Sequence, residues 1–156
     1  MGIATQITVR VRTKDAKFLG TSMGGAFVTL RDSQTGELLS KGVTQGSTGD
    51  SEIIMNTPHE RTKTLSDELT ASFHAELDLE EPRHITATAF GPLAQRQSAN
   101  EVSSSQWVIP GRHITAGDAW MIELRGFAVD ITSPPAHSHY PAGTEQVEVR
   151  SNVIMM

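Results

Sequence analysis

The chain contains no cysteine and few aromatic side chains. Its 156 residues include two tryptophans, one tyrosine and five phenylalanines. Without thiols the protein can form neither a disulfide nor a thiolate zinc site, so its stability has to come from packing. The absence of cysteine also fits a reducing compartment. A chain of this length can bury roughly two-thirds of its unfolded surface in one core, so we expect a single domain over residues 1–156.

Several classes of function also lack their usual sequence signals. The formal charge is -5 and the basic residues are scattered along the chain, so nucleic acid is not an expected partner. No apolar run approaches the ~20 residues of a membrane span, and the N-terminus has no signal-peptide core. We therefore expect a cytoplasmic protein without a membrane span.

The strongest pattern in the sequence is strand alternation, and its longest example runs from Trp120 to Ile131. Apolar and polar side chains alternate up to Leu124, and the phase reverses after Gly126. A slip of this kind is typical of a β-bulge, in which glycine is common. We therefore predict one long central strand that bends near Gly126 and turns both halves toward the core. A short strand at Trp107–Ile109 is expected to precede it.

Further strands are predicted from the same alternation. They cover Ile3–Val11, Ala26–Arg31, Glu37–Val43, Ile53–Met55, Ala71–Leu79, Ile85–Ala89 and Gln146–Met156. The polar turn between the second and third of these segments predicts a hairpin. The Asn56–Asp67 and Gly91–Ser105 segments are polar and show no sustained period, so they are expected to be connections.

A second hairpin is expected between Ala71–Leu79 and Ile85–Ala89. Keeping both apolar faces on one side places Leu77 opposite Ala87 and Ala75 opposite Ala89. The three alanines leave space that bulkier side chains must fill if packing is to reach normal density. Trp107 and Trp120 are the candidates for filling it.

About eight strands separated by turns, with no sustained helical period, predict an all-β protein. We expect a β-sandwich of two antiparallel sheets, with a jelly roll as the alternative. The proline-rich stretch 133–143 is predicted to be an irregular connection, and 145–156 a C-terminal strand or tail.

Two histidines near the end of the sequence are candidate metal ligands. His137 and His139 flank one serine, which points both imidazoles to one side of an extended chain, and Glu145 follows. The pattern resembles the first metal motif of cupins, although the gap before the glutamate is longer and Ile131 replaces the upstream glycine. The resemblance implies a metal-dependent jelly-roll enzyme with a divalent transition metal on these three residues and His113. The alternative is an exposed linker.

A second resemblance covers Ala26–Ile53, which reads AFVTLRDSQTGELLSKGVTQGSTGDSEI. It is similar to the hairpin and glycine-rich loop of transthyretin-like and carboxypeptidase-regulatory-like β-sandwiches. Two enzyme groups on this general fold are disfavoured. Hydroxyisourate hydrolases end in a Tyr-Arg-Gly-Ser-like tetrapeptide, whereas this sequence ends Asn152-Val153-Ile154-Met155-Met156. Intradiol dioxygenases ligate iron with two tyrosines, whereas Tyr140 is the single tyrosine here. The resemblance therefore implies a non-catalytic role, as in many such modules.

The chain ends in four apolar residues, Val153, Ile154, Met155 and Met156. An apolar end left in water promotes association, so we expect a strand that pairs with this sheet or with the edge of a neighbour. We therefore predict a non-enzymatic structural or accessory subunit that binds other proteins, as a homo-oligomer or in a larger assembly, through sheet edges and this strand.

A glycan-binding sandwich is the remaining alternative. Exposed tryptophan side chains can stack on sugar rings, and Trp107 and Trp120 are the candidates. Trp120 fits this role poorly, because the strand phase buries it.

Overall fold

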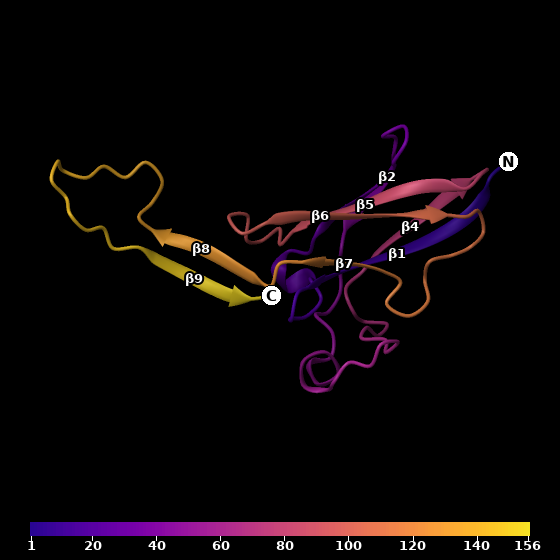
Figure 1. Cartoon of the computed structure of the whole chain (residues 1–156), viewed down its shortest axis with the longest axis horizontal. Helices are drawn as coiled ribbons and strands as arrows, with labels where there is room; N and C mark the ends of the chain where they lie inside the picture. Colours follow the sequence, from indigo (N-terminus) through magenta and orange to yellow (C-terminus); the bar gives the residue numbers. More distant parts are fainter.

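The computed structural model describes residues 1–156 and is built almost entirely of β-strands (Figure 1). The strands are β1 (Ile3–Thr13), β2 (Phe27–Asp32), β3 (Leu38–Val43), β4 (Phe73–Leu79), β5 (Arg83–Gly91), β6 (Asn100–Val108), β7 (Trp120–Leu124), β8 (Phe127–Ser133) and β9 (Arg150–Met155). Two short helical segments, η1 (Thr21–Met23) and η2 (Glu52–Asn56), lie in loops. Neither approaches the length of a membrane-spanning helix.

Two main sheets form the body of the protein. One is antiparallel with the order β3-β2-β5-β6, and the other has the order β4-β1-β7. In the second sheet, β1 pairs antiparallel with β4 and parallel with β7, so this sheet is mixed. Neither sheet closes into a barrel, which confirms the sandwich-like all-β class. Strands β8 and β9 form a separate two-stranded unit.

The core lies between the two main sheets. It is a single cluster of 20 buried residues that includes Ala75, Ala87 and Ala89, the alanines noted in the sequence. Trp120 is 5% exposed, belongs to the same cluster, and donates its indole N–H to Ser104 Oγ on β6 at 2.8 Å. The prediction that Trp120 fills the core beside these alanines is therefore confirmed. The same prediction for Trp107 was wrong, because this side chain is 59% exposed.

The β2–β3 hairpin forms as predicted, and Asp32 organises its turn. Asp32 Oδ1 accepts hydrogen bonds from the backbone N–H groups of Thr35 and Gln34, at 2.9 and 2.8 Å. These bonds stabilise the ionised carboxylate and hold the pKa of Asp32 below its ordinary value, with a smaller contribution from the nearby Arg83 guanidinium. Gly36 closes the turn with a positive φ of 76°.

The long bent strand predicted for Trp120–Ile131 was wrong. The chain forms two strands that belong to different sheets, and they are separated at Arg125-Gly126. A side chain on Gly126 would place its Cβ 2.4 Å from the carbonyl oxygen of Lys14, so only glycine fits where the chain leaves the body. The phase reversal marks this exit and not a bulge within one strand.

The hairpin predicted between Ala71–Leu79 and Ile85–Ala89 was also wrong. β4 pairs with β1, whereas β5 pairs with β2 and β6, so the short link between β4 and β5 crosses from one sheet to the other. Ala87 lies opposite Leu30 and Ala89 opposite Val28. Crossing between the sheets keeps both apolar faces in the core just as well as the predicted register did.

Two local predictions failed for lack of a clear period. Ile53–Met55 lies within the helical segment η2, where Ile54 is buried and Asp50 Oδ1 accepts a hydrogen bond from the N–H of Glu52 at 2.8 Å. Residues 100–105, expected to be a connection, form most of β6. This strand is rich in serine and has one exposed face, so apolar alternation does not mark it.

Met156 completes the core of the body from the end of the sequence. Its side chain is 7% exposed, and its carbonyl oxygen accepts hydrogen bonds from Thr13 Oγ1 at 3.0 Å and from the N–H of Lys17 at 3.2 Å. Met156, one of the four predicted interface residues, therefore does not lie on the surface of the chain. Met156 instead ties β9 to the body.

We expect Met156→Ala to lower the free energy of unfolding by about 2–5 kcal/mol, because truncating a buried methionine removes apolar contacts and leaves a cavity. Urea denaturation followed by circular dichroism measures this change. Leu69→Ala is the control, because Leu69 is 76% exposed and its truncation should cost no more than about 0.5 kcal/mol. Equal costs for the two variants would contradict the anchoring role of Met156.

Candidate functional site

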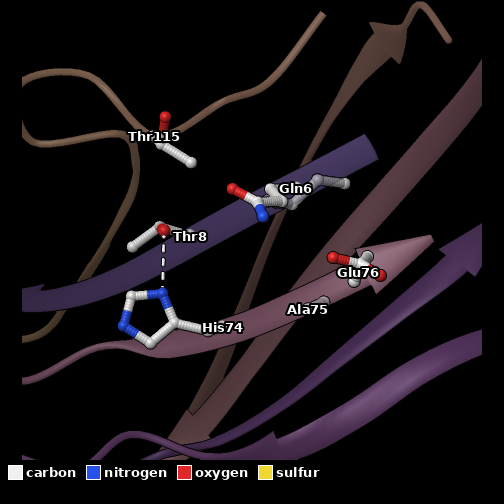
Figure 2. A pocket seen from close by; sticks show the side chains of 7 residues that line it. Gln6, Thr8, His74, Ala75, Glu76 and Thr115 are labelled. Atoms are coloured by element: carbon white, nitrogen blue, oxygen red, sulfur yellow. Dashed lines mark hydrogen bonds between the residues drawn. The ribbon is translucent and has the colours of Figure 1, made fainter. Parts of the chain in front are cut away.

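A depression on the outer face of the β4-β1-β7 sheet is bordered by His74 (Figure 2). It has a volume of about 310 Å³, and its polar lining comes from Gln6, Thr8, His74, Glu76 and Thr115. Thr8 and His74 are paired across β1 and β4, so their side chains share one face. A second, wider depression of about 580 Å³ lies on the other side of His74. The imidazole of His74 therefore lines both depressions.

Both ring nitrogens of His74 are bonded to hydroxyl groups. Nδ1 lies 2.9 Å from Thr8 Oγ1, and Nε2 lies 3.0 Å from Ser72 Oγ. One ring nitrogen of a neutral imidazole donates and the other accepts, so the ring is held in place. An activated serine usually needs a base that is itself oriented by a charged group. Here the orienting group is a neutral threonine, so the arrangement favours a polar surface over a nucleophilic centre.

The four predicted metal ligands do not form a cluster. No group of three or more histidine, aspartate or glutamate side chains in the chain is arranged to hold a metal ion. His137, His139 and Glu145 lie in the loop between β8 and β9, whereas His113 lies between β6 and β7 on the far side of the molecule (Figure 1). Nδ1 of His113 accepts a hydrogen bond from the N–H of Gln6 at 3.0 Å. His113 therefore joins its loop to β1.

An aromatic surface lies on the outer face of the antiparallel sheet. Trp107 on β6 is paired with His84 on β5, and their ring centroids are 5.3 Å apart with an interplanar angle of 56°. Trp107 also borders a depression of about 220 Å³ that Arg112 and His113 help to line. An exposed indole beside hydrogen-bonding groups is a surface on which a flat apolar ring can stack.

Strands β8 and β9, with the loop 134–149, project from the body as an arm (Figure 1). The chain enters the arm at Gly126 and returns to the body at Met156, and the loop lies at the far end. Phe127, near the body, pairs with Met155, and Ser133, near the loop, pairs with Arg150. The arm therefore carries the C-terminal strand that the sequence predicts, paired with β8.

One face of the arm is apolar and uncovered. The register brings together side chains of the same parity on the two strands, with Phe127 opposite Met155 and Val129 opposite Val153. Ile131 lies on the same face. All five side chains are exposed: Phe127 by 61%, Met155 by 58%, Val129 by 44%, Val153 by 61% and Ile131 by 51%. We call these five residues the arm face. The alternation of Phe127, Val129 and Ile131 was predicted from the sequence, but the prediction that they face the core was wrong.

The two edges of the arm differ. On β8, Ser98 Oγ bonds to both the N–H and the carbonyl oxygen of Val129. The side-chain amide of Gln97 does the same for Ile131, accepting from its N–H at 2.9 Å and donating to its carbonyl oxygen at 3.2 Å. Gln97 and Ser98 lie between β5 and β6 and take the place of a neighbouring strand. The edge of β8 is therefore closed.

The outer edge of β9 is open. Because Val129 and Ile131 direct their backbone groups away from β9, the opposing residues Val153 and Ser151 direct theirs away from β8. No other strand of the chain lies along that edge. An unpaired strand edge of this kind is a template for another strand.

Three of the four predicted interface residues lie on the surface of the arm. Val153 and Met155 belong to the arm face, and Ile154 is 37% exposed on the opposite face. The sequence did not reveal the closed edge of β8, because Gln97 and Ser98 lie in a polar stretch with no periodic signal.

Comparison with known proteins adds no relative. No family model matches the sequence, and neither the curated proteins nor the solved structures contain a match. The resemblance of Ala26–Ile53 to transthyretin-like sandwiches therefore stays a prediction.

We expect Gln97→Ala combined with Ser98→Ala to loosen the arm from the body, because the backbone groups of Val129 and Ile131 lose their partners. Amide hydrogen exchange measured by NMR should become faster at both residues. The N–H of Ala128 is the internal control, because it faces β9 and should keep its protection. Unchanged exchange at Val129 and Ile131 would contradict the closed edge.

Proposed function

We propose that this protein is a non-enzymatic assembly subunit whose arm contacts a neighbouring copy of the same chain. The arm face supports this most directly. Its five apolar side chains are exposed to solvent, and the β8-β9 arm that carries them is a two-stranded sheet with no core of its own. A two-stranded ribbon is only marginally stable in water, and large exposed apolar patches usually mark interaction sites. A partner that covers this face stabilises both the arm and the assembly.

The total surface area supports the same conclusion. The chain exposes 9682 Å², whereas a compact monomer of its mass, 16.9 kDa, should expose about 7,700 Å². The excess is about 2,000 Å², and a standard interface buries about 800 Å² on each partner. The surplus surface is therefore large enough for a stable contact between subunits.

We expect the wild-type chain to form an oligomer and Val153→Asp to dissociate it, because the substitution places a charge in the centre of the arm face. Light scattering coupled to size-exclusion chromatography measures the mass. Point substitutions are preferable to deleting 152–156, because that deletion would also remove the buried Met156. The thermal melting curve of Val153→Asp shows whether the body stays folded.

Leu69→Asp is the matched control, because Leu69 is an exposed apolar residue in a loop of the body. This variant should keep the wild-type mass. A monomeric wild-type chain, or a Val153→Asp variant that stays folded and oligomeric, would refute the proposed function.

The Trp107 surface favours glycan binding as a second candidate function. Trp107 is exposed beside His84, and Arg112 supplies hydrogen-bond donors at the adjacent depression. Sugar rings present apolar faces that stack on indole and hydroxyl groups that bond to guanidinium donors.

If this second candidate is correct, Trp107→Ala should abolish binding on a glycan array while the chain stays folded, because the stacking ring is removed. Phe90→Ala is the control, because Phe90 lies on the same sheet face away from Trp107. An array with no wild-type binding would eliminate this candidate.

A further inference from the structure

The segment Glu145–Val149 has the sequence pattern of a strand but pairs with nothing in its own chain. Val147 and Val149 alternate with Glu148 and Arg150, in phase with Val153 of β9. The ladder with β8 begins only at Arg150, and no backbone hydrogen bond joins residues 145–149 to the rest of the chain. Val149 is 61% exposed. A segment with strand periodicity and free backbone groups needs a partner strand.

From the open edge of β9 and this unpaired segment, we infer that residues 145–153 pair antiparallel with the same residues of a second copy, across a two-fold axis at Val149. This inference rests on the proposed function and adds a contact between strand edges to the face contact proposed there. A two-fold axis makes the interface self-complementary, so one segment serves both partners. Strand addition at a free edge supplies main-chain hydrogen bonds that a face contact alone does not.

Charge complementarity selects this register. With Val149 opposite itself, Glu148 of each copy lies opposite Arg150 of the other, and Gln146 lies opposite Asn152. Moving the axis by one residue to Arg150 would place two guanidinium groups opposite each other. Opposite charges across a strand pair stabilise it, and like charges destabilise it. Each chain already holds its own Glu148 and Arg150 close, with Nε and Oε1 2.7 Å apart, so the pairs can exchange between copies.

The backbone directions of β9 fit the same register. Val153 and Ser151 direct their N–H and carbonyl groups outward, and Val149 follows with the same parity. The register pairs odd-numbered residues of one copy with odd-numbered residues of the other. The outward N–H and carbonyl groups of one copy therefore meet those of its partner. The arms then form one continuous sheet in the order β8-β9-β9-β8. The closed edges of β8 become its outer limits, so pairing stops at two copies.

Val149→Cys tests the register directly, because the chain has no other cysteine. Directly opposed residues in this pairing have Cα atoms about 5.5 Å apart, which a disulfide can span. Mild oxidation should convert most of the protein to a covalent dimer. The mass of this dimer in solution should equal that of the wild-type oligomer. Val147→Cys is the matched control: its two copies are offset by four residues, roughly 13 Å, and should not cross-link.

A charge-exchange experiment tests the same contact without oxidation. Glu148→Arg and Arg150→Glu should each weaken self-association about tenfold, because each creates two like-charged pairs across the axis. Mixing the two variants should restore association as a heterodimer, although neither chain then has an internal ion pair. Native mass spectrometry with one variant isotope-labelled distinguishes the heterodimer from the homodimers.

The outcomes separate this inference from the proposed function. If the wild-type chain is oligomeric but the Val149→Cys variant does not cross-link, or the mixed charge variants do not associate, the inference is overturned and the assembly function still stands. A monomeric wild-type chain would overturn both.

Discussion

Backbone hydrogen bonding at strand edges is the constraint on which the rest of this structure depends. Every strand edge presents N–H and carbonyl groups that need partners. Between neighbouring strands of the two main sheets the ladders supply them, and along β8 of the arm the side chains of Gln97 and Ser98 do so. The outer edge of β9 has no such cover. The distribution of covered and uncovered edges therefore determines where another chain can pair.

The body and the arm are stabilised in different ways. The body has a core of 20 buried residues between two sheets, whereas the arm is a single layer with one exposed apolar face. Both strands of the arm are joined to the body at the same end, β8 through the tight backbone contact at Gly126 and β9 through the buried side chain of Met156. Because both strands of the arm are fixed to the body, the orientation of the arm face is defined before any partner arrives.

The sequence predicts individual strands better than their partners. Alternation is a local property, so it identified β1, β2, β3, β4 and β5 and the apolar character of β8. Pairing depends on distant residues, and two registers satisfy the same alternation. The β4–β5 link was therefore mistaken for a hairpin, and the reversal at Gly126 for a bulge. The first part of β6, residues 100–105, escaped detection because serines occupy much of it and leave no apolar alternation; its pairing with β5 holds it in the sheet.

The candidate site was only partly visible for the same reason. The apolar residues Val153, Ile154 and Met155 mark the arm in the sequence, because an exposed apolar run is a local signal. Which side of the arm is uncovered depends on Gln97 and Ser98, which lie far from β8 in the sequence and carry no pattern. The burial of Met156 depends on where β9 ends relative to the core, and no local property of a C-terminal methionine reveals it.

The parallel pairing of β1 with β7 has a consequence for the order of folding. Val9 lies near the start of the chain and its partner Trp120 follows most of the body, so closing this ladder requires a long loop to be ordered first. Contacts of such high sequence separation form slowly compared with hairpins such as β2–β3. A nascent chain that has not yet synthesised β7 leaves one edge of β1 without its native partner. That edge of β1 therefore stays open to incorrect strand pairing until the second half of the chain has been synthesised.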